Sequence, residues 1–196
     1  MTGSLILLWL AALPLMGSPG PATLSLAAVG AQHGFRRGLP YLVGIIAGTF
    51  GVTVMIALGV TGLVLALPGA AIVLTVAAAA YILYLAWRIA TAPPLQDDPQ
   101  RRPPAFPGGL FLALANPKAF AAIGAVYATY TLIPGDPLRD GLAKCAALLL
   151  VIVAVNVTWL AAGAALSRLL RSPRTARIVN LAFAGLLLLA VALALI

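Results

Sequence analysis

Charged residues are scarce in this chain of 196 residues, and acidic residues are the scarcest of all. Only 8% of the residues are charged, and 4 Asp and Glu stand against 12 Lys and Arg. Soluble domains carry roughly 25% charged residues. A chain in which 63% of the residues are hydrophobic cannot cover a water-facing surface. The composition therefore excludes a soluble globular domain and predicts an integral membrane protein.

Groups that carry out chemistry are also scarce. The single cysteine, Cys145, excludes an intramolecular disulfide, a cysteine-based metal site and a thiol redox pair. Serine, histidine and acidic residues do not gather as a hydrolytic site requires. The four acidic residues are all expected in loops, which leaves no carboxylate within a membrane span as a metal ligand or proton carrier: Asp97, Asp98, Asp136 and Asp140. We therefore expect no enzyme activity, no cofactor and no metal site.

Long apolar runs dominate the sequence. A transmembrane helix needs ~20 mostly apolar residues, and we expect one all-α transmembrane domain over residues 1–196 with six such spans. A polar linker at 91–107, rich in proline, divides the spans into three and three. Gly44 and Gly48 in the second span predict close helix packing. The expected spans are 5–31, 40–66, 70–89, 108–132, 141–166 and 178–196.

The basic residues predict the topology. The connections after spans one, three and five hold most of them: Arg36, Arg37, Arg88, Arg101, Arg102, Arg168, Arg171, Arg174 and Arg177. The connections after spans two and four hold only Arg139 and Lys144. Cytoplasmic loops carry the excess of Lys and Arg, so both termini are expected outside. This distribution accounts for most of the net charge of +8 without nucleic acid as a partner.

Prolines interrupt two of the spans. The first span contains "SPGP" with Pro19 and Pro21, and the fourth contains "NPK" with Pro117. Three spans on each side of the linker place the second half upside down relative to the first. Matching broken helices in inverted repeats form the binding site of many secondary transporters. We therefore predict two inverted three-helix repeats whose broken helices, the first and the fourth, face each other.

The breaks offer groups for a zwitterionic ligand. Each proline removes one backbone donor, so the carbonyls of Leu15, Gly17 and Ala113 are expected to be free for an ammonium group. The half-helix that begins near Ala22 presents N–H groups that suit a carboxylate. An amino acid carries both charges. The alternative is that the prolines only kink the helices to help them pack.

Lys118 adjoins the second break inside a span, where a charge is costly and usually faces a cavity. The alternative is a side chain that reaches the membrane interface with its long stem. Thr49 and Asn156 either hydrogen-bond a substrate or hold helices together. The candidate substrate-binding residues are Pro19, Gly20, Pro21, Asn116, Pro117 and Lys118, with Thr49 and Asn156 as further candidates.

The chain resembles the LysE/RhtB family of bacterial amino-acid exporters over nearly its whole length. The resemblance rests on the order and spacing of the segments "SPGPATLSLAAVGAQHGFRRGLPYLVGIIAG", "YILYLAWRIA", "GLFLALANPKAF" and "NVTWLAAGAAL". It implies a six-span exporter in the cytoplasmic membrane that moves amino acids or close derivatives outward, driven by the proton gradient. Some members carry an acid in the second or fifth span, at places that correspond here to Thr49 and Asn156.

Two other classes are weighed against an exporter. A metal or redox protein of related architecture would need paired cysteines, acids or histidines within the spans, which this chain lacks. A non-transporting or channel-like membrane subunit remains the second alternative. The amino acid that is moved and the oligomeric state have no signature in the sequence.

Overall fold

The computed structural model describes residues 2–59, 104–166 and 173–195, and positions 76, 80, 83, 84, 86, 87, 90 and 91. Within these residues all regular structure is helical, which confirms the predicted class. The predicted span 70–89 and the linker 91–107 lie largely outside the described residues. The described helices are α1 (Thr2–Gly17), α2 (Pro21–Ala57), α5 (Phe106–Leu114), α6 (Pro117–Thr129), α7 (Pro137–Leu166) and α8 (Pro173–Leu195).

Two of these helices are long and apolar enough to cross a membrane. They are α2 and α7, and α5 with α6 would be a third span if this pair, bent by 59°, is counted as one. These helices are typical of a multi-pass membrane protein. The six spans, their bounds and the inverted repeat stay predictions.

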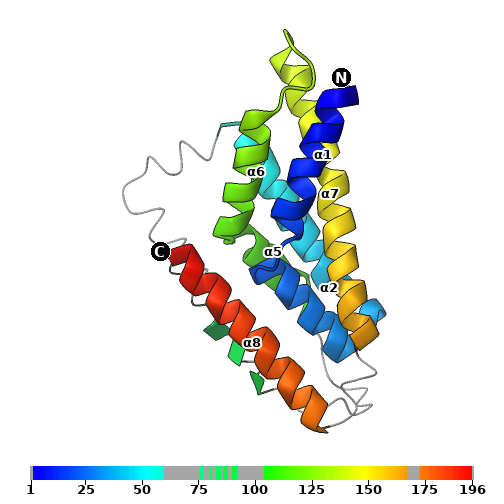
Figure 1. Cartoon of the computed structure of the whole chain (residues 1–196), viewed down its shortest axis with the longest axis vertical. Coiled ribbons are helices and arrows are strands. Elements are labelled where there is room, and N and C mark those ends of the chain that lie inside the picture. Colours follow the sequence, from blue (N-terminus) through cyan, green and yellow to red (C-terminus); the bar gives the residue numbers. More distant parts are fainter. Residues whose placement is uncertain are drawn as a thin grey trace.

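Helix α2 reverses its direction at Gly34, so it contains two segments that lie side by side (Figure 1). Gly34 has φ 75° and ψ 170°, a conformation that only glycine adopts readily. The Tyr41 hydroxyl donates a hydrogen bond of 3.0 Å to the Ser25 hydroxyl across the reversal. The predicted polar connection at 32–38 is therefore wrong in one respect: helix continues on both sides of a single non-helical residue.

Glycines allow α2 to approach α7 and α5 closely. A Cβ atom on Gly163 of α7 would lie 2.0 Å from the Ala27 carbonyl oxygen, and one on Gly30 would lie 2.3 Å from that of Leu160. A Cβ atom on Gly44 would lie 2.2 Å from the Phe106 carbonyl oxygen of α5. The close packing predicted at Gly44 and Gly48 is confirmed, and its partner is α5.

Gly163→Ala is expected to separate α2 from α7 and to destabilise the protein. A methyl group cannot occupy space 2.0 Å from a backbone oxygen, and overpacking of this kind costs roughly 1–3 kcal/mol or more. Thermal unfolding of the purified protein measures the effect. Gly124→Ala in α6 is the matched control, because a Cβ atom there meets nothing within 4 Å. Equal melting temperatures for the two variants would contradict the contact.

Two indole groups join α1 to α7 through hydrogen bonds, and one of these bonds is made at the last residue of α1. Trp9 donates to the Ala147 carbonyl (3.1 Å), and Trp159 donates to the Gly17 carbonyl (3.0 Å). The second bond holds the last residue of α1 beside the middle of α7. The break between α1 and α2 therefore lies within the helix bundle.

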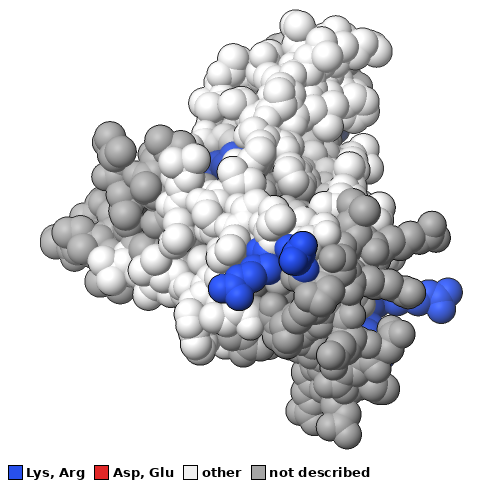
Figure 2. Space-filling view, turned by 60° about the horizontal axis from the view of Figure 1, so that its bottom comes forward, with Lys and Arg blue, Asp and Glu red and all other residues white. Residues whose placement is uncertain are grey.

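Four exposed arginines lie at one end of the molecule, and the exposed Arg139 lies at the other end, in the first turn of α7. The turn of α2 and the start of α8 lie at the lower end in Figure 1, whereas the N-terminus and the connection between α6 and α7 lie at the upper end. Figure 2 shows the lower face with basic side chains and no acidic ones among the atoms it describes. The exposed basic residues of these two segments are Arg36, Arg37, Arg174 and Arg177.

Candidate functional site

The first break lies between Gly17, the end of α1, and Pro21, the start of α2. Thr23 satisfies the backbone at this point, because its hydroxyl accepts a bond from the Gly20 N–H (2.9 Å) and lies 3.1 Å from the Gly20 carbonyl. Gly20 has φ −172° and ψ 178°, an extended conformation. Thr23 therefore holds the chain extended where a continuous helix would otherwise form.

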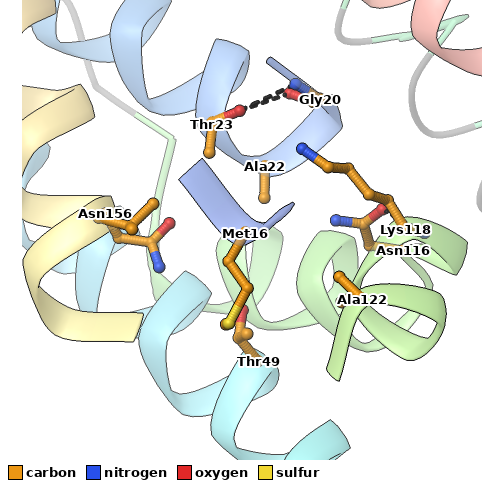
Figure 3. A pocket seen from close by; sticks show the side chains of 11 residues that line it. Met16, Gly20, Ala22, Thr23, Thr49, Asn116, Lys118, Ala122 and Asn156 are labelled. Atoms are coloured by element: carbon orange, nitrogen blue, oxygen red, sulfur yellow. Dashed lines mark hydrogen bonds between the residues drawn. The ribbon is translucent and has the colours of Figure 1, made fainter. Parts of the chain in front are cut away.

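The second break lies between Leu114 and Pro117, where α5 ends and α6 begins. Asn116 caps α6, because its side-chain oxygen accepts a bond from the Lys118 N–H (3.2 Å). Its side-chain nitrogen then points toward Met16 (Figure 3). The sequence Asn-Pro suits the start of a helix. Asn116 is the cap, and Pro117 is a first residue whose missing N–H would have had no partner within the helix.

The carbonyls that were expected to be free for a ligand are not free. Proline does remove their usual helical donors, but other groups of the protein replace them. The Leu15 carbonyl accepts a bond from the Ser18 hydroxyl (3.0 Å), that of Gly17 from the Trp159 indole (3.0 Å), and that of Ala113 from the Asn116 backbone N–H (3.3 Å). This expectation was wrong because it counted only bonds within one helix.

Lys118 joins the two breaks. Its ammonium group donates to the Ser18 carbonyl and to the Pro19 carbonyl, the latter at 3.3 Å. Its stem runs past Gly20, where a Cβ atom would lie 2.7 Å from the Lys118 Cδ atom. The half-buried side chain therefore points at the first break, as Figure 3 shows, and away from its own helix.

A small cavity of about 40 Å³ lies beside this contact. It has room for one or a few water molecules, which need about 10–15 Å³ each on this measure. Among the described residues, its wall carries one ammonium group, neutral polar side chains and alanine methyl groups, and no acidic side chain. The lining residues are Met16, Gly20, Ala22, Thr23, Thr49, Asn116, Lys118, Ala119, Ala122, Val155 and Asn156.

The structure brings five of the eight predicted residues to this cavity: Gly20, Thr49, Asn116, Lys118 and Asn156. Pro21 and Pro117 are the first residues of α2 and α6, and Pro19 contributes the carbonyl that Lys118 binds. These three prolines shape the breaks but do not line the cavity.

Thr49 and Asn156 lie on the side of the cavity opposite Lys118 (Figure 3). The Asn156 side-chain nitrogen donates to the Ile152 carbonyl of its own helix (2.7 Å). One further N–H of that nitrogen and the side-chain oxygen remain, so Asn156 has both a donor and an acceptor for other partners. Both residues are nearly buried, at 7% and 5% exposure, and they supply neutral polar atoms.

Sequence reasoning missed Met16 and Thr23. Figure 3 shows the Met16 side chain between the Lys118 side of the cavity and the Asn156 side. Its position follows from the end of α1, which no local pattern reveals. The signal for Thr23 was present, since a polar side chain three residues after the residue that caps a helix can accept a bond from the N–H of that capping residue, here Gly20.

Asp140 and Lys144 were also placed wrongly. Both were assigned to connections, but α7 begins at Pro137 and includes them. They form a buried ion pair with Oδ2 and Nζ 2.8 Å apart and with side chains 12% and 8% exposed. Asp140 also accepts bonds from the Leu132 and Ile133 N–H groups (2.6 and 2.8 Å). An acid four residues before a lysine was the available signal.

Lys144 completes this cluster from the side of α6. Its ammonium group donates to the Tyr127 carbonyl (3.0 Å) and lies 4.6 Å from the centre of the Tyr127 ring. The pair therefore ties the end of α6 and the connection after it to α7. It does not line the cavity between the breaks.

Asp140→Ala is expected to lower the free energy of unfolding by roughly 3–5 kcal/mol, because it leaves a buried ammonium group without its partner. Thermal unfolding of the purified protein measures the loss. Arg139→Ala is the control, since it removes an exposed ion pair with Asp136 and is expected to cost at most about 1 kcal/mol. A melting temperature of Asp140→Ala no lower than that of Arg139→Ala would refute the role of the buried pair.

Known proteins similar to this chain cover most of its length. The profile of the LysE type translocator family matches residues 13–196. A cysteine/O-acetylserine efflux protein of Escherichia coli O139:H28 is 30% identical over 172 residues, which is 87% of each chain. The cysteine/O-acetylserine efflux proteins of Escherichia coli K12 and Shigella flexneri serotype 5b are 30% identical over 155 residues, 79% of each chain. No solved structure matches the chain significantly.

Proposed function

This chain belongs to the LysE type translocator family, and we propose on that basis that it exports an amino acid or a close derivative across the bacterial cytoplasmic membrane. A translocator moves its solute and is not an enzyme. The observation that carries the proposal is the cavity between the two helix breaks, whose wall, in the part of the chain that the structure describes, holds one ammonium group and no acidic side chain. A net positive site of this kind favours a ligand with a carboxylate.

The two half-helices support the same ligand. Helix α2 begins at Pro21 and α6 begins at Pro117, and both starts lie next to the cavity. The first turn of a helix carries a partial positive charge, which favours a carboxylate. At α6 the Lys118 and Ala119 N–H groups already bond to Asn116, so N–H groups for a ligand are expected at the start of α2. The proposed site therefore comprises Gly20, Asn116 and Lys118, with Thr49 and Asn156 facing the side chain of the ligand.

The cavity wall also bears on the size of the ligand. Alanines at 22, 119 and 122 and the neutral groups of Thr49 and Asn156 favour a short, uncharged side chain. A cavity of about 40 Å³ is far below the 300–1,000 Å³ of typical ligand pockets, so binding requires the walls to separate. Cysteine and O-acetylserine, named in the relatives, are the first compounds to test.

Counterflow tests the proposal. Purified protein in liposomes preloaded with unlabelled cysteine or O-acetylserine is expected to accumulate the labelled compound transiently, whereas empty liposomes do not. An imposed pH gradient is expected to drive net transport, and a protonophore is expected to abolish this drive. Absence of counterflow with every neutral amino acid would favour the non-transporting subunit instead.

We further propose that the breaks belong to two inverted repeats and that both termini face outward. The exposed arginines near the α2 turn would then lie in the cytoplasm. In a chain with Cys145→Ala, Leu138→Cys is expected to react with an impermeant thiol reagent in whole cells, and Arg36→Cys only after lysis. Both positions are exposed. The reverse pattern of labelling would overturn the orientation.

A further inference from the structure

The hydrogen-bond partners of the Lys118 ammonium group are unusual for a lysine that is expected within a membrane span. Its ammonium group binds two successive backbone carbonyls, those of Ser18 and Pro19, from a position one hundred residues away in the sequence. The residues that line the adjoining cavity include no acid. The cation is therefore held by carbonyl dipoles, in an arrangement that any primary ammonium group of similar reach could adopt.

The path to these carbonyls depends on the absence of a side chain at Gly20. Its extended backbone is one that any residue can adopt, so conformation does not require glycine. A Cβ atom at this position would lie 2.7 Å from Cδ and 3.0 Å from Nζ of Lys118, so a larger residue would displace the flexible lysine side chain from its present path. Gly20 thus leaves a narrow passage, the space that the Lys118 stem occupies on its way to the Ser18 and Pro19 carbonyls.

We propose that the Ser18 and Pro19 carbonyls form a binding site for a primary ammonium group, which Lys118 fills in this structure and the ammonium of the transported amino acid takes over. The second half of this statement rests on the proposed function. The exchange conserves charge, since the zwitterion brings an ammonium to the carbonyls and a carboxylate to the displaced Lys118. Lys118 is then an internal competitor of the ligand and, once displaced, its partner.

This exchange gives the helix break a role beyond a kink. A kink alone would leave Lys118 free to pair with any acceptor, and it would not predict a site specific for ammonium. The carbonyls of Leu15 and Gly17 accept bonds from neutral donors, a hydroxyl and an indole. The Ser18 carbonyl also lies 3.3 Å from the Thr23 hydroxyl, in addition to the Lys118 ammonium group. The Ser18 and Pro19 carbonyls are the ones at this break that bind a positively charged group.

Replacement of the missing side chain by a small molecule tests the site directly. Lys118→Ala removes three methylene groups and the ammonium, and n-propylammonium supplies the same atoms. At about ten times its dissociation constant, n-propylammonium is expected to raise the melting temperature of purified Lys118→Ala by roughly 3–6 °C. The wild-type protein is expected to show no such shift, because Lys118 occupies the site.

Three controls separate binding from a general effect of the amine. The double variant Lys118→Ala, Gly20→Ala is expected to lose the shift, because the methyl group added at position 20 fills the passage. The lysine side chain is already removed in this variant, so the methyl group cannot clash with it. n-Propanol, which lacks the charge, is expected to have no effect. Arg139→Ala, which removes an exposed arginine, is expected to behave as the wild type.

A folded Lys118→Ala protein that shows no saturable shift, or the same shift in all variants, would overturn the ammonium site. Lys118→Ser removes the same group and provides the same test if Lys118→Ala does not fold. The outcome is independent of the proposed function. Counterflow without amine binding would refute only the ammonium site. Amine binding without counterflow would refute amino-acid export and, with it, the exchange, but it would leave the ammonium site standing.

Discussion

Lys118→Ala is expected to lower the initial rate of amino-acid counterflow by roughly 10- to 150-fold, because a hydrogen bond to a charged group contributes about 1.5–3 kcal/mol. The change removes the one ammonium group of the cavity wall, so the carboxylate of the ligand loses its partner. Lys118→Arg is expected to restore little transport. A planar guanidinium presents a different shape from the compact ammonium and does not fit the narrow passage beside Gly20.

The alternative for Lys118 predicts a different result. A lysine that only reaches the membrane interface can be replaced by arginine, which extends to the interface equally well. Full transport by Lys118→Arg would therefore contradict a role in binding. The same preparations should show normal amounts of protein in the membrane, because the partners of Lys118 among the described residues are neutral backbone carbonyls.

Replacement of both Pro19 and Pro21 by alanine is expected to abolish most export while the amount of protein in the membrane stays normal or rises. Alanine restores the backbone donors that proline lacks at both positions, so the helix can continue through the break. A more regular helix would draw the Ser18 and Pro19 carbonyls into its own hydrogen bonds. Lys118 would then lose both of its partners.

Transport measured in cells and in liposomes, with the protein quantified in the same membranes, tests this second expectation. Pro14→Ala is a suitable control, because Pro14 lies inside α1 and does not form the break. It is expected to leave transport close to that of the wild type. Wild-type export by a well-expressed Pro19 and Pro21 double variant would show that these prolines only bend the chain.

Local chemistry made several features of the site predictable. Proline removes a backbone donor wherever the chain places it, so the helix ends near Pro19 and Pro117 follow from the residues themselves. The cap of α6 by Asn116 depends on two neighbouring residues. The glycine spacing at Gly44 and Gly48 indicated a close contact, although it did not identify α5 as the partner.

The errors share one cause. Leu15 and Ala113 find local donors that a count of helical bonds leaves out, and Gly17 finds an indole from α7. Asp140 was assigned to a loop because its polarity is costly in a membrane span, but Lys144 four residues later offsets that cost. In each case the prediction left out a hydrogen-bond or ion-pair partner that the polar group has in the structure.

The sequence by itself determined that the chain is an α-helical membrane protein with helix ends at two proline-containing segments. These properties depend on composition and on bonds between residues a few positions apart. Only the tertiary structure decided that Lys118 reaches the carbonyls of Ser18 and Pro19, and that Thr49 and Asn156 lie across the same cavity. These contacts join residues far apart in the sequence, and they exist because glycines let α2 pack closely against α5 and α7.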